Sequence, residues 1–395
     1  MTGLLPVAEA QARLLALATP VEVQQAPLLE AAGRWAAARV VARRTQPFAN
    51  LSAMDGYAIR FSELPGPWRV TSESKAGSLL PAPLDPGEAA RIFTGAPVPP
   101  GADTVLVQEE AARSGDQLRL DGAGPKRIGQ NIRAQGMDFE TGDVLIEPGD
   151  LITAAHVGLA AAAGHASIEV RRPVRITLIS TGDELVPVGA DGAPHQLPSS
   201  NAPMLRALLG GSGVTVTDLG IAPDRIERIV ALIREAADAD IIITSGGASV
   251  GDHDLVKPAF DAAGAQLDFW RVAMRPGKPL MAGTLGQAII LGLPGNPLSA
   301  YVTACLFARP LIARLGGSTS PYAPVRRARL AHALPANGER DHYLRGIWNE
   351  EGVSALEGQD SSALTNLVKA GLFIIRAAHA PAASPGDLVQ IIEIA

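Results

Sequence analysis

Residues 240–254 read Asp-Ile-Ile-Ile-Thr-Ser-Gly-Gly-Ala-Ser-Val-Gly-Asp-His-Asp, an apolar run followed at once by a glycine, serine and aspartate loop. The run 241–244 lacks the polar alternation of a half-exposed strand, so it predicts a strand buried on both faces. Strand-like and helix-like segments alternate around it. Strands are expected at 174–180, 214–219, 239–245, 267–274, 279–282 and 288–293, and helices at 201–209, 224–237, 255–263 and 298–315. This alternation predicts a parallel α/β sheet covered by helices on both faces.

Polar loops follow the predicted strands. Their sequences are Ser-Thr-Gly-Asp-Glu-Leu at 180–185, the loop at 244–254, Arg-Pro-Gly-Lys-Pro at 275–279 and Gly-Leu-Pro-Gly-Asn-Pro at 292–297. In an open parallel sheet, ligands bind at the carboxyl ends of the strands. We therefore expect all of these loops to open on the same edge of the sheet.

The glycine-serine loop predicts phosphate binding. Gly246 and Gly247 allow backbone N–H groups to approach an anion, and Ser245 and Ser249 add hydroxyl donors. The alternative is a plain turn, in which the glycines supply positive φ and a serine caps a helix.

Carboxylates lie in the same loops. Asp183, Glu184, Asp252 and Asp254 fit Mg²⁺, which binds one or two carboxylates together with substrate phosphates. Helix capping is the alternative, and it is strongest for Asp224, which stands where a helix would begin.

A cationic group precedes and occupies the loop at 275–279. Arg271, Arg275 and Lys278 could hold an oxyanion, because guanidinium and ammonium groups match its oxygens. The alternative is a solvated loop with ordinary surface charge.

Length and composition bound the remaining possibilities. The chain has 395 residues, 47% of them hydrophobic, which suggests two to four domains at roughly 100–200 residues each. A net charge of −6 argues against a nucleic-acid binder. The single cysteine, Cys305, lies in an apolar run and is expected in the core. We expect no membrane span, with 151–166 as the nearest candidate, no signal peptide, and a cytoplasmic location.

Two further regions read as small β domains. One covers about 46–136, with strands expected at 68–71, 89–93, 104–108 and 117–120. The other begins near 323, with strands expected at 326–333, 343–348, 353–356, 372–376 and 387–393.

The order of these loops resembles the molybdopterin molybdenumtransferases, the MoeA and gephyrin E-domain family, over nearly the whole chain. The residues that carry the resemblance are Pro-Phe-Ala-Asn-Leu-Ser-Ala-Met-Asp-Gly-Tyr-Ala at 47–58, Arg-Ile-Phe-Thr-Gly-Ala-Pro-Val-Pro at 91–99, Gly-Ala-Asp-Thr-Val-Leu-Val-Gln-Glu at 101–109, the segments at 131–133 and 136–139, and the sheet-edge loops.

The resemblance implies a multidomain protein of α/β and β parts. An elongated dimerisation domain would comprise 1–50 and 137–170, a small β domain 51–136, the α/β molybdopterin-binding domain 171–322, and a β-barrel-like domain 323–395. It also implies a homodimer with its site between subunits. The molybdopterin adenylyltransferase, which shares the α/β module, would be a further partner.

The family reaction takes adenylyl-molybdopterin, molybdate and Mg²⁺, and releases AMP. The residues carried over as catalytic are Asp55, Thr94, Asp138, Glu184 and Asp224. Those carried over as substrate-binding are Thr181, Ser245, Gly246, Gly247, Ser249, Pro294, Asn296, Arg271, Arg275, Lys278, Arg345 and Ser361. Those carried over as metal-binding are Glu184, Asp252 and Asp254.

The chain departs from the family pattern at several of these places. Arg271 and Arg275 stand where many members have lysine, Ala248 where valine is usual, and Asp360 where a small neutral residue is common. Two other functions stay open: a scaffold that needs only dimerisation, and an adenylyltransferase. The acidic and cationic loop residues favour the insertase over the scaffold, and the extra domains argue against the adenylyltransferase.

Overall fold

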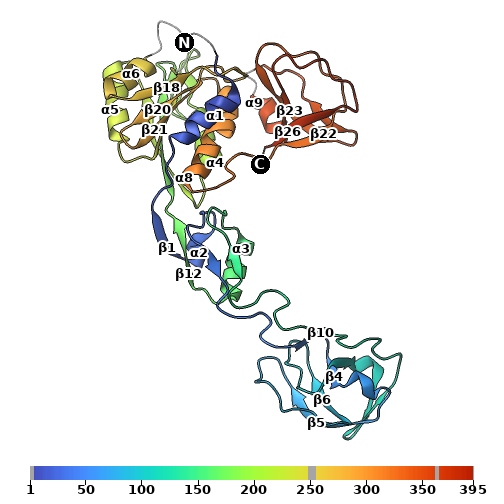
Figure 1. Ribbon diagram of the computed structural model, residues 1–395. Helices are drawn as coiled ribbons and strands as arrows, with labels where there is room; N and C mark the ends of the chain where they lie inside the picture. Colours follow the sequence, from blue (N-terminus) through green and yellow to red (C-terminus); the bar gives the residue numbers. More distant parts are fainter. Residues whose placement is uncertain (1–3, 248–254, 361–363, 395) are drawn as a thin grey trace. The chain divides into compact units, whose positions relative to one another are not determined.

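The computed structural model describes residues 4–247, 255–360 and 364–394, and these form two compact units (Figure 1). Unit 1 comprises residues 1–38, 148–153 and 169–395, and unit 2 comprises 39–147 and 154–168. The chain therefore leaves unit 1 and returns to it, which no single stretch of the sequence indicated.

The central sheet of unit 1 has the strand order β16-β13-β17-β21-β20-β18. Its strands are β13 (Val174–Thr181), β16 (Val214–Ala222), β17 (Ile241–Ser245), β18 (Gln266–Trp270), β20 (Met281–Leu285) and β21 (Ala288–Leu293). The first four strands of that order pair in parallel, as predicted. The prediction of a purely parallel sheet is wrong at β20, which pairs antiparallel with both β21 and β18. A hairpin turn joins β20 directly to β21, which leaves no length for a parallel crossover.

The predicted strand at 267–274 is also too long. β18 ends at Trp270 because Arg271 has a φ of 84°, in the left-handed region that breaks an extended strand. The chain continues into β19 (Met274–Arg275), which joins a different sheet.

Helices cover both faces of the central sheet, as the alternation predicted. On one face, α5 (Ile226–Glu235) and α6 (Val256–Ala263) bury apolar residues against β13, β17 and β21. The other face is covered by α1 (Val7–Ala16), α4 (Asn201–Leu209) and the segment Pro297–Leu315. The inner strands β13, β17 and β21 are therefore buried on both sides, which explains their lack of polar alternation.

The segment Pro297–Leu315 runs through α7 (Pro297–Thr303), a π-helical turn (Ala304–Ala308) and α8 (Arg309–Leu315). It is long and apolar enough to cross a membrane, so the expectation that no segment comes near this length is wrong. It is 78% buried inside the protein, however, as a core helix would be. Cys305 lies in its middle and is buried as predicted, and burial raises the pKa of its thiol to about 11.

The end of the chain forms a second sheet in unit 1, with the order β19-β23-β25-β26-β22 and β24 paired to β23. Its further strands are β22 (Arg326–Arg329), β23 (Asp341–Asn349), β24 (Gly352–Ala355), β25 (Leu372–Arg376) and β26 (Leu388–Glu393). A bridge between Leu330, which follows β22, and Val353 of β24 brings opposite sides of this sheet together. The barrel-like curvature that was expected is therefore present, although β19 comes from outside the predicted domain.

Unit 2 contains a six-stranded sheet with the order β7-β4-β6-β5-β9-β8. Its strands are β4 (Gly56–Ile59), β5 (Trp68–Ser74), β6 (Glu88–Ile92), β7 (Thr104–Val107), β8 (Ala111–Ser114) and β9 (Gln117–Leu120). This confirms the strands expected in this region and adds β4 and β8. Ile59, Trp68, Leu106 and Leu118 form part of its core.

Short elements complete the chain. They are β1 (Val23–Pro27), α2 (Leu28–Ala31), β2 (Val40–Val41), β3 (Leu51–Ser52), β10 (Ile132–Arg133), β11 (Val144–Ile146), α3 (Ala154–Ala162), β12 (Ser167–Arg171), β14 (Leu185–Val186), β15 (Leu197–Pro198), α9 (Leu364–Lys369) and 3-10 turns at Phe61–Glu63 and Gln108–Glu110. The residues predicted to carry chemistry lie mainly in the loops between these elements.

Candidate functional site

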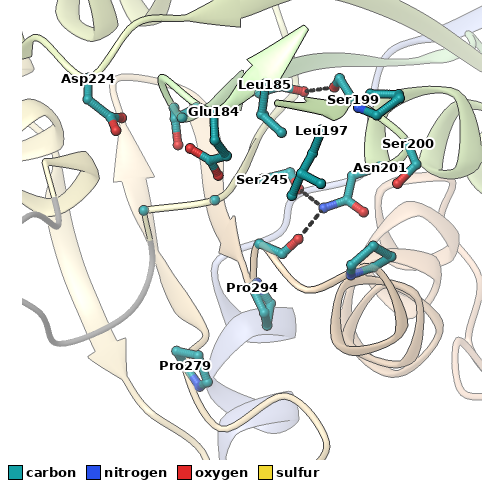
Figure 2. Close-up of a pocket in the computed structure, with 18 residues that line it drawn as sticks. Glu184, Leu185, Leu197, Ser199, Ser200, Asn201, Asp224, Ser245, Pro279 and Pro294 are labelled. Carbon is teal, nitrogen blue, oxygen red and sulfur yellow. Dashed lines mark hydrogen bonds between the residues drawn. The ribbon is translucent and has the colours of Figure 1, made fainter. Parts of the chain in front are cut away.

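A cavity of about 590 Å³ opens where β13, β17 and β21 end (Figure 2). The loop after each of these strands lines it, together with the start of α4 and Pro279 from the segment before β20. The residues that line it are Ser180, Thr181, Gly182, Glu184, Leu185, Leu197, Pro198, Ser199, Ser200, Asn201, Asp224, Ser245, Gly246, Gly247, Pro279, Pro294, Gly295 and Pro297. The structure thus brings together Thr181, Glu184, Asp224, Ser245, Gly246, Gly247 and Pro294 from the predicted set.

Gly246 is required by the shape of the loop after β17. Its φ is 104°, and a Cβ placed on it would lie 2.5 Å from the backbone oxygen of Thr181. A side chain would therefore meet both backbone strain and a clash with the neighbouring strand end. The glycine brings two cavity loops together more closely than any other residue would allow.

Asn201, which sequence reasoning missed, connects the loops of the cavity. Its amide nitrogen donates to the Ser245 hydroxyl at 2.7 Å and to the Gly295 carbonyl at 2.7 Å (Figure 2). At the start of a predicted helix, an asparagine reads as an ordinary helix-initiating residue. Its real partners lie 44 and 94 residues away, a distance that no local pattern reveals.

Polar atoms in and behind the cavity wall are buried without a hydrogen-bond partner among the described residues. They are the hydroxyl oxygens of Thr181 and Thr244 and the amide oxygen of Asn201. Buried polar atoms without partners are destabilising, so proteins seldom keep them without a reason. The wall of the cavity and the layer behind it thus keep buried polar atoms that the described residues leave unsatisfied.

Two carboxylates, those of Glu184 and Asp224, line the cavity. Asp183 and Asp224 each accept a hydrogen bond from the other's backbone N–H, at 2.9 and 3.4 Å. The alternative that Asp224 caps a helix is wrong, because α5 begins at Ile226 with Arg225 as its N-cap. The Asp224 carboxylate instead belongs to the cavity.

The described residues hold no group of three or more His, Cys, Asp or Glu side chains that could ligate a metal ion. Two carboxylates nevertheless suffice for Mg²⁺ where phosphate oxygens of a substrate and water supply the other ligands. The predicted residues Ser249, Asp252, Asp254 and Ser361 lie outside the described residues.

The cationic group does not line this cavity, although Pro279 beside it does. Arg271 stacks on the Trp270 ring, with its guanidinium carbon 4.9 Å from the ring centroid, and its Nε is buried with no hydrogen-bond partner in the described part of the chain. Arg275 and Lys278 are exposed. These three residues thus lie close in sequence to Pro279, which lines the cavity, but they do not line the cavity themselves.

Arg275 and Arg345 both act on His342, which the sequence reading missed. Residue 275 pairs with residue 342 between β19 and β23. Burial, followed by the positive charges of Arg275, Arg340 and Arg345, lowers the pKa of His342 to about 4. Positive charge from two distant segments is therefore concentrated at one place, as an oxyanion site requires.

Arg345 is held rigidly in this region. Its side chain is 1% exposed and donates to Gln359 Oε1 at 3.3 Å and to the Gly358 carbonyl at 3.1 Å. Burial lowers its pKa, and the carboxylate of Asp360 opposes that shift. Asp360 is thus close enough to Arg345 for its charge to be felt.

The predicted Asn296 has a structural role in this structure. It is the N-cap of α7, and its side-chain oxygen accepts from the Ser299 N–H at 3.4 Å. It does not line the cavity, although Pro294, Gly295 and Pro297 around it do.

A second hollow of about 660 Å³ shares Ser180, Gly182, Leu185 and Ser199 with the cavity. The Ser199 hydroxyl donates to that of Ser180 at 3.2 Å in the shared wall. This hollow contains none of the residues Ser245, Gly246 or Gly247, so the candidate site is the first cavity.

In unit 2, Asp55 and Thr94 form a closed pair. Asp55 Oδ1 accepts from the Thr94 backbone N–H at 2.7 Å and from the Thr94 hydroxyl at 2.8 Å. These bonds, with a smaller contribution from the charge of Arg91, lower the pKa of Asp55. The Arg91 guanidinium lies over the rings of Tyr57 and Phe93 and thereby joins the two strands that carry the pair.

Asp138, the remaining predicted catalytic residue, is also in unit 2 and is exposed. Its backbone N–H donates to the Gln46 carbonyl at 3.1 Å.

Comparisons with known protein families give matches along nearly the whole chain. The model of the MoeA N-terminal region (domain I and II) matches residues 5–164, that of the probable molybdopterin binding domain matches 177–314, and that of the MoeA C-terminal region (domain IV) matches 327–394. A molybdopterin molybdenumtransferase from Haemophilus influenzae is 35% identical over 399 residues, covering 98% of each chain. The chain belongs to the MoeA family.

Other relatives agree with this membership. Molybdopterin molybdenumtransferase 2 of Mycobacterium tuberculosis is 36% identical over 355 residues, covering 86% of each chain. The crystal structure of a molybdopterin biosynthesis MoeA protein from Pyrococcus horikosii superposes with a TM-score of 0.78 at 26% identity, covering 99% of each chain. As a member of the MoeA family, the chain is a transferase of molybdenum-cofactor biosynthesis.

Proposed function

We propose that this MoeA-family chain inserts molybdenum from molybdate into adenylyl-molybdopterin and releases AMP. The observation that carries the proposal is the cavity where β13, β17 and β21 end, in which a glycine-serine loop faces two carboxylates. In the reaction, the bond between the phosphates of AMP and molybdopterin is hydrolysed. The two dithiolene sulfurs then replace two oxygens of molybdate on the metal, and these oxygens leave as water after taking up the thiol protons and protons from solvent.

The loop after β17 would bind the substrate phosphates. Ser245 contributes a hydroxyl and Gly246 a backbone without a side chain, so an anion can approach closely. Glu184 and Asp224 on the same cavity would hold Mg²⁺, together with Asp252 and Asp254 of the following loop. When bound, the ion would neutralise the negative charge of the phosphates.

Molybdate would bind near Arg275 and Arg345, where positive charge gathers around His342. Arg271, Lys278 and Ser361 would complete that pocket. A charged donor such as Arg345, buried and fixed by Gln359, loses little freedom when it binds an oxyanion. The site is thus suited to a compact tetrahedral dianion.

We further propose that the working form is a cytoplasmic homodimer. In it, Asp55, Thr94 and Asp138 of one copy would act on the substrate held by the other. A mixture of Asp55→Ala and Glu184→Ala chains should then recover part of the activity through heterodimers. No recovery after verified subunit exchange would contradict the shared site.

Release of AMP tests the reaction directly. Purified protein is mixed with adenylyl-molybdopterin, Mg²⁺ and increasing molybdate, and AMP is measured by chromatography. We expect AMP release that depends on molybdate, and a large loss in Glu184→Gln. Consumption of ATP with release of pyrophosphate would instead identify an adenylyltransferase. No turnover with either set of substrates would favour a scaffold.

A further inference from the structure

The amide of Asn201 is the only group among the described residues that hydrogen-bonds to both the end of β17 and the loop after β21. Its nitrogen donates to Ser245 Oγ and to the Gly295 carbonyl, each at 2.7 Å (Figure 2). Both Asn201 and Ser245 line the cavity. One side chain at the start of α4 therefore fixes two cavity segments that are distant in sequence.

The direction of these bonds determines what Ser245 can do. A side-chain amide nitrogen donates and cannot accept, so Ser245 Oγ accepts the bond from Asn201. A hydroxyl carries a single hydrogen, which this bond leaves unused. No described residue accepts that hydrogen, so it is available to a ligand in the cavity.

The orientation of the amide cannot reverse easily. The Gly295 carbonyl has no hydrogen to give and therefore requires the nitrogen of Asn201. The opposite end of the amide, Asn201 Oδ1, is buried without a partner among the described residues. The protein tolerates this unsatisfied oxygen while it keeps the nitrogen on Ser245 and Gly295.

We propose that Asn201 is a positioning residue for phosphate binding, because its amide makes the Ser245 hydroxyl a hydrogen-bond donor toward the substrate phosphate. This inference rests on the proposed function, in which Ser245 binds that phosphate. An aspartate at 201 would reverse the arrangement. Its carboxylate would accept the Ser245 hydrogen and would face the Gly295 carbonyl with a negative charge.

The affinity for AMP, with Mg²⁺ present, tests the inference without requiring turnover. Isothermal titration calorimetry would compare the wild type, Ser245→Ala, Asn201→Ala, Asn201→Asp and the double variant Asn201→Ala/Ser245→Ala. A charge-assisted hydrogen bond contributes enough to predict roughly 10- to 150-fold weaker binding by Ser245→Ala. Asn201→Asp should weaken binding at least as much. Asn201→Ala should weaken it less, since the freed hydroxyl still rotates.

The double variant shows whether Asn201 acts by positioning the Ser245 hydroxyl or only by stabilising the fold. If Asn201 acts through Ser245, Asn201→Ala should have almost no further effect on AMP affinity once Ser245 is alanine. Asn337→Asp is the matched control, because the Asn337 amide also ties backbone carbonyls, at Arg376 (2.9 Å) and Ala377 (2.7 Å), away from the cavity. It should change stability and leave AMP affinity unchanged.

Distinct results would overturn the inference. If Asn201→Ala weakened AMP binding equally in the wild type and in Ser245→Ala, Asn201 would have a structural role alone. Wild-type affinity in folded Asn201→Asp would refute the polarity argument, and if that variant does not fold, the alanine cycle still decides. A wild type that binds no AMP would overturn the phosphate assignment of the proposed function as well.

Discussion

The two edges of the central sheet differ in whether their buried polar groups have hydrogen-bond partners. At the edge where the strands begin, the Asp240 carboxylate accepts from both terminal nitrogens of Arg172, at 2.6 and 2.8 Å, and from the Arg175 N–H at 2.8 Å. At the edge where the strands end, Thr181 and Thr244 keep buried hydroxyls without partners among the described residues. The first edge satisfies these polar atoms within the protein, and the second leaves the hydroxyls of Thr181 and Thr244 unsatisfied among the described residues.

This difference teaches that β13 and β17 separate stability from function along their own length. Burial alone would raise the pKa of Asp240, but the hydrogen bonds from Arg172 and Arg175 outweigh it and lower that pKa. Changes at the starting edge should therefore affect folding. Changes at the finishing edge should affect binding, and some of them should even stabilise the fold.

The largest loss of stability is expected from Asp240→Asn, which keeps the shape of the side chain and removes its charge. Breaking this mostly buried ion pair leaves Arg172 with the exposed Glu22 as its remaining counter-charge, so the free energy of unfolding should fall by about 2–3 kcal/mol. Urea denaturation followed by circular dichroism measures this. Glu227→Gln removes an exposed carboxylate and should change little. If folded Asp240→Asn released less AMP than the wild type, the two edges of the sheet would not divide stability from function in this way.

Gly246→Ala should be next in size and should affect both properties. A Cβ at positive φ costs about 1–3 kcal/mol, and here it would also lie 2.5 Å from the Thr181 oxygen. Gly286→Ala is the control, since its φ is also positive, at 60°, but nothing lies within 4 Å of the added Cβ. The excess loss in Gly246→Ala, in thermal unfolding and AMP affinity, measures the close approach of the loops. Equal losses would show that the clash relaxes away.

Thr181→Val tests the comparison of the two edges further, because we expect this change in a buried residue to stabilise the fold. Replacing a buried hydroxyl that no described residue satisfies by a methyl group should raise the free energy of unfolding by about 1 kcal/mol, while AMP affinity falls. Thr303→Val is the matched control, because the Thr303 hydroxyl is buried and donates to the Ser299 carbonyl at 2.7 Å. That variant should lose stability. Destabilisation by Thr181→Val would mean that its hydroxyl is already satisfied.

At neutral pH the smallest effect is that of His342, because its contribution to stability changes only as the pH falls. Its folded-state pKa is about 4, below the ordinary value of 6.5, so the unfolded chain binds the proton more readily. Stability should therefore fall as pH falls from about 6.5 to about 4, and His342→Gln should reduce that slope. Thermal unfolding at several pH values measures the slope, with the exposed His195→Gln as control. An unchanged slope would show that neither burial nor the neighbouring arginines lower the pKa of His342.

Much of the fold follows from the apolar pattern of the sequence, and the exceptions have physical reasons. The run at 241–244 predicted a buried strand because it lacks polar alternation, and 201–209 predicted a helix that the structure has with the same bounds. The pattern records burial but not direction, so the antiparallel β20 was missed. Two-residue strands such as β14 carry too few side chains to form any pattern.

The candidate site was predictable where its residues are consecutive and not where they meet across the fold. Ser245, Gly246 and Gly247 follow a strand directly, so their position at the sheet edge could be inferred. Asn201 and His342 depend on partners that only the folded chain brings near them. Ser249, Asp252, Asp254 and Ser361 stay predictions, as do the metal and the division into domains.

The buried cysteine has a consequence for chemical compatibility. The proposed substrate carries two sulfur atoms that are easily oxidised and that exchange with thiols. Cys305 is the chain's single cysteine, and with a thiol pKa of about 11 it keeps its proton at neutral pH. Thiolate is the reactive form in disulfide exchange, so the protein offers its substrate almost no competing sulfur nucleophile. A chain built in this way can handle a dithiolene without forming mixed disulfides with it.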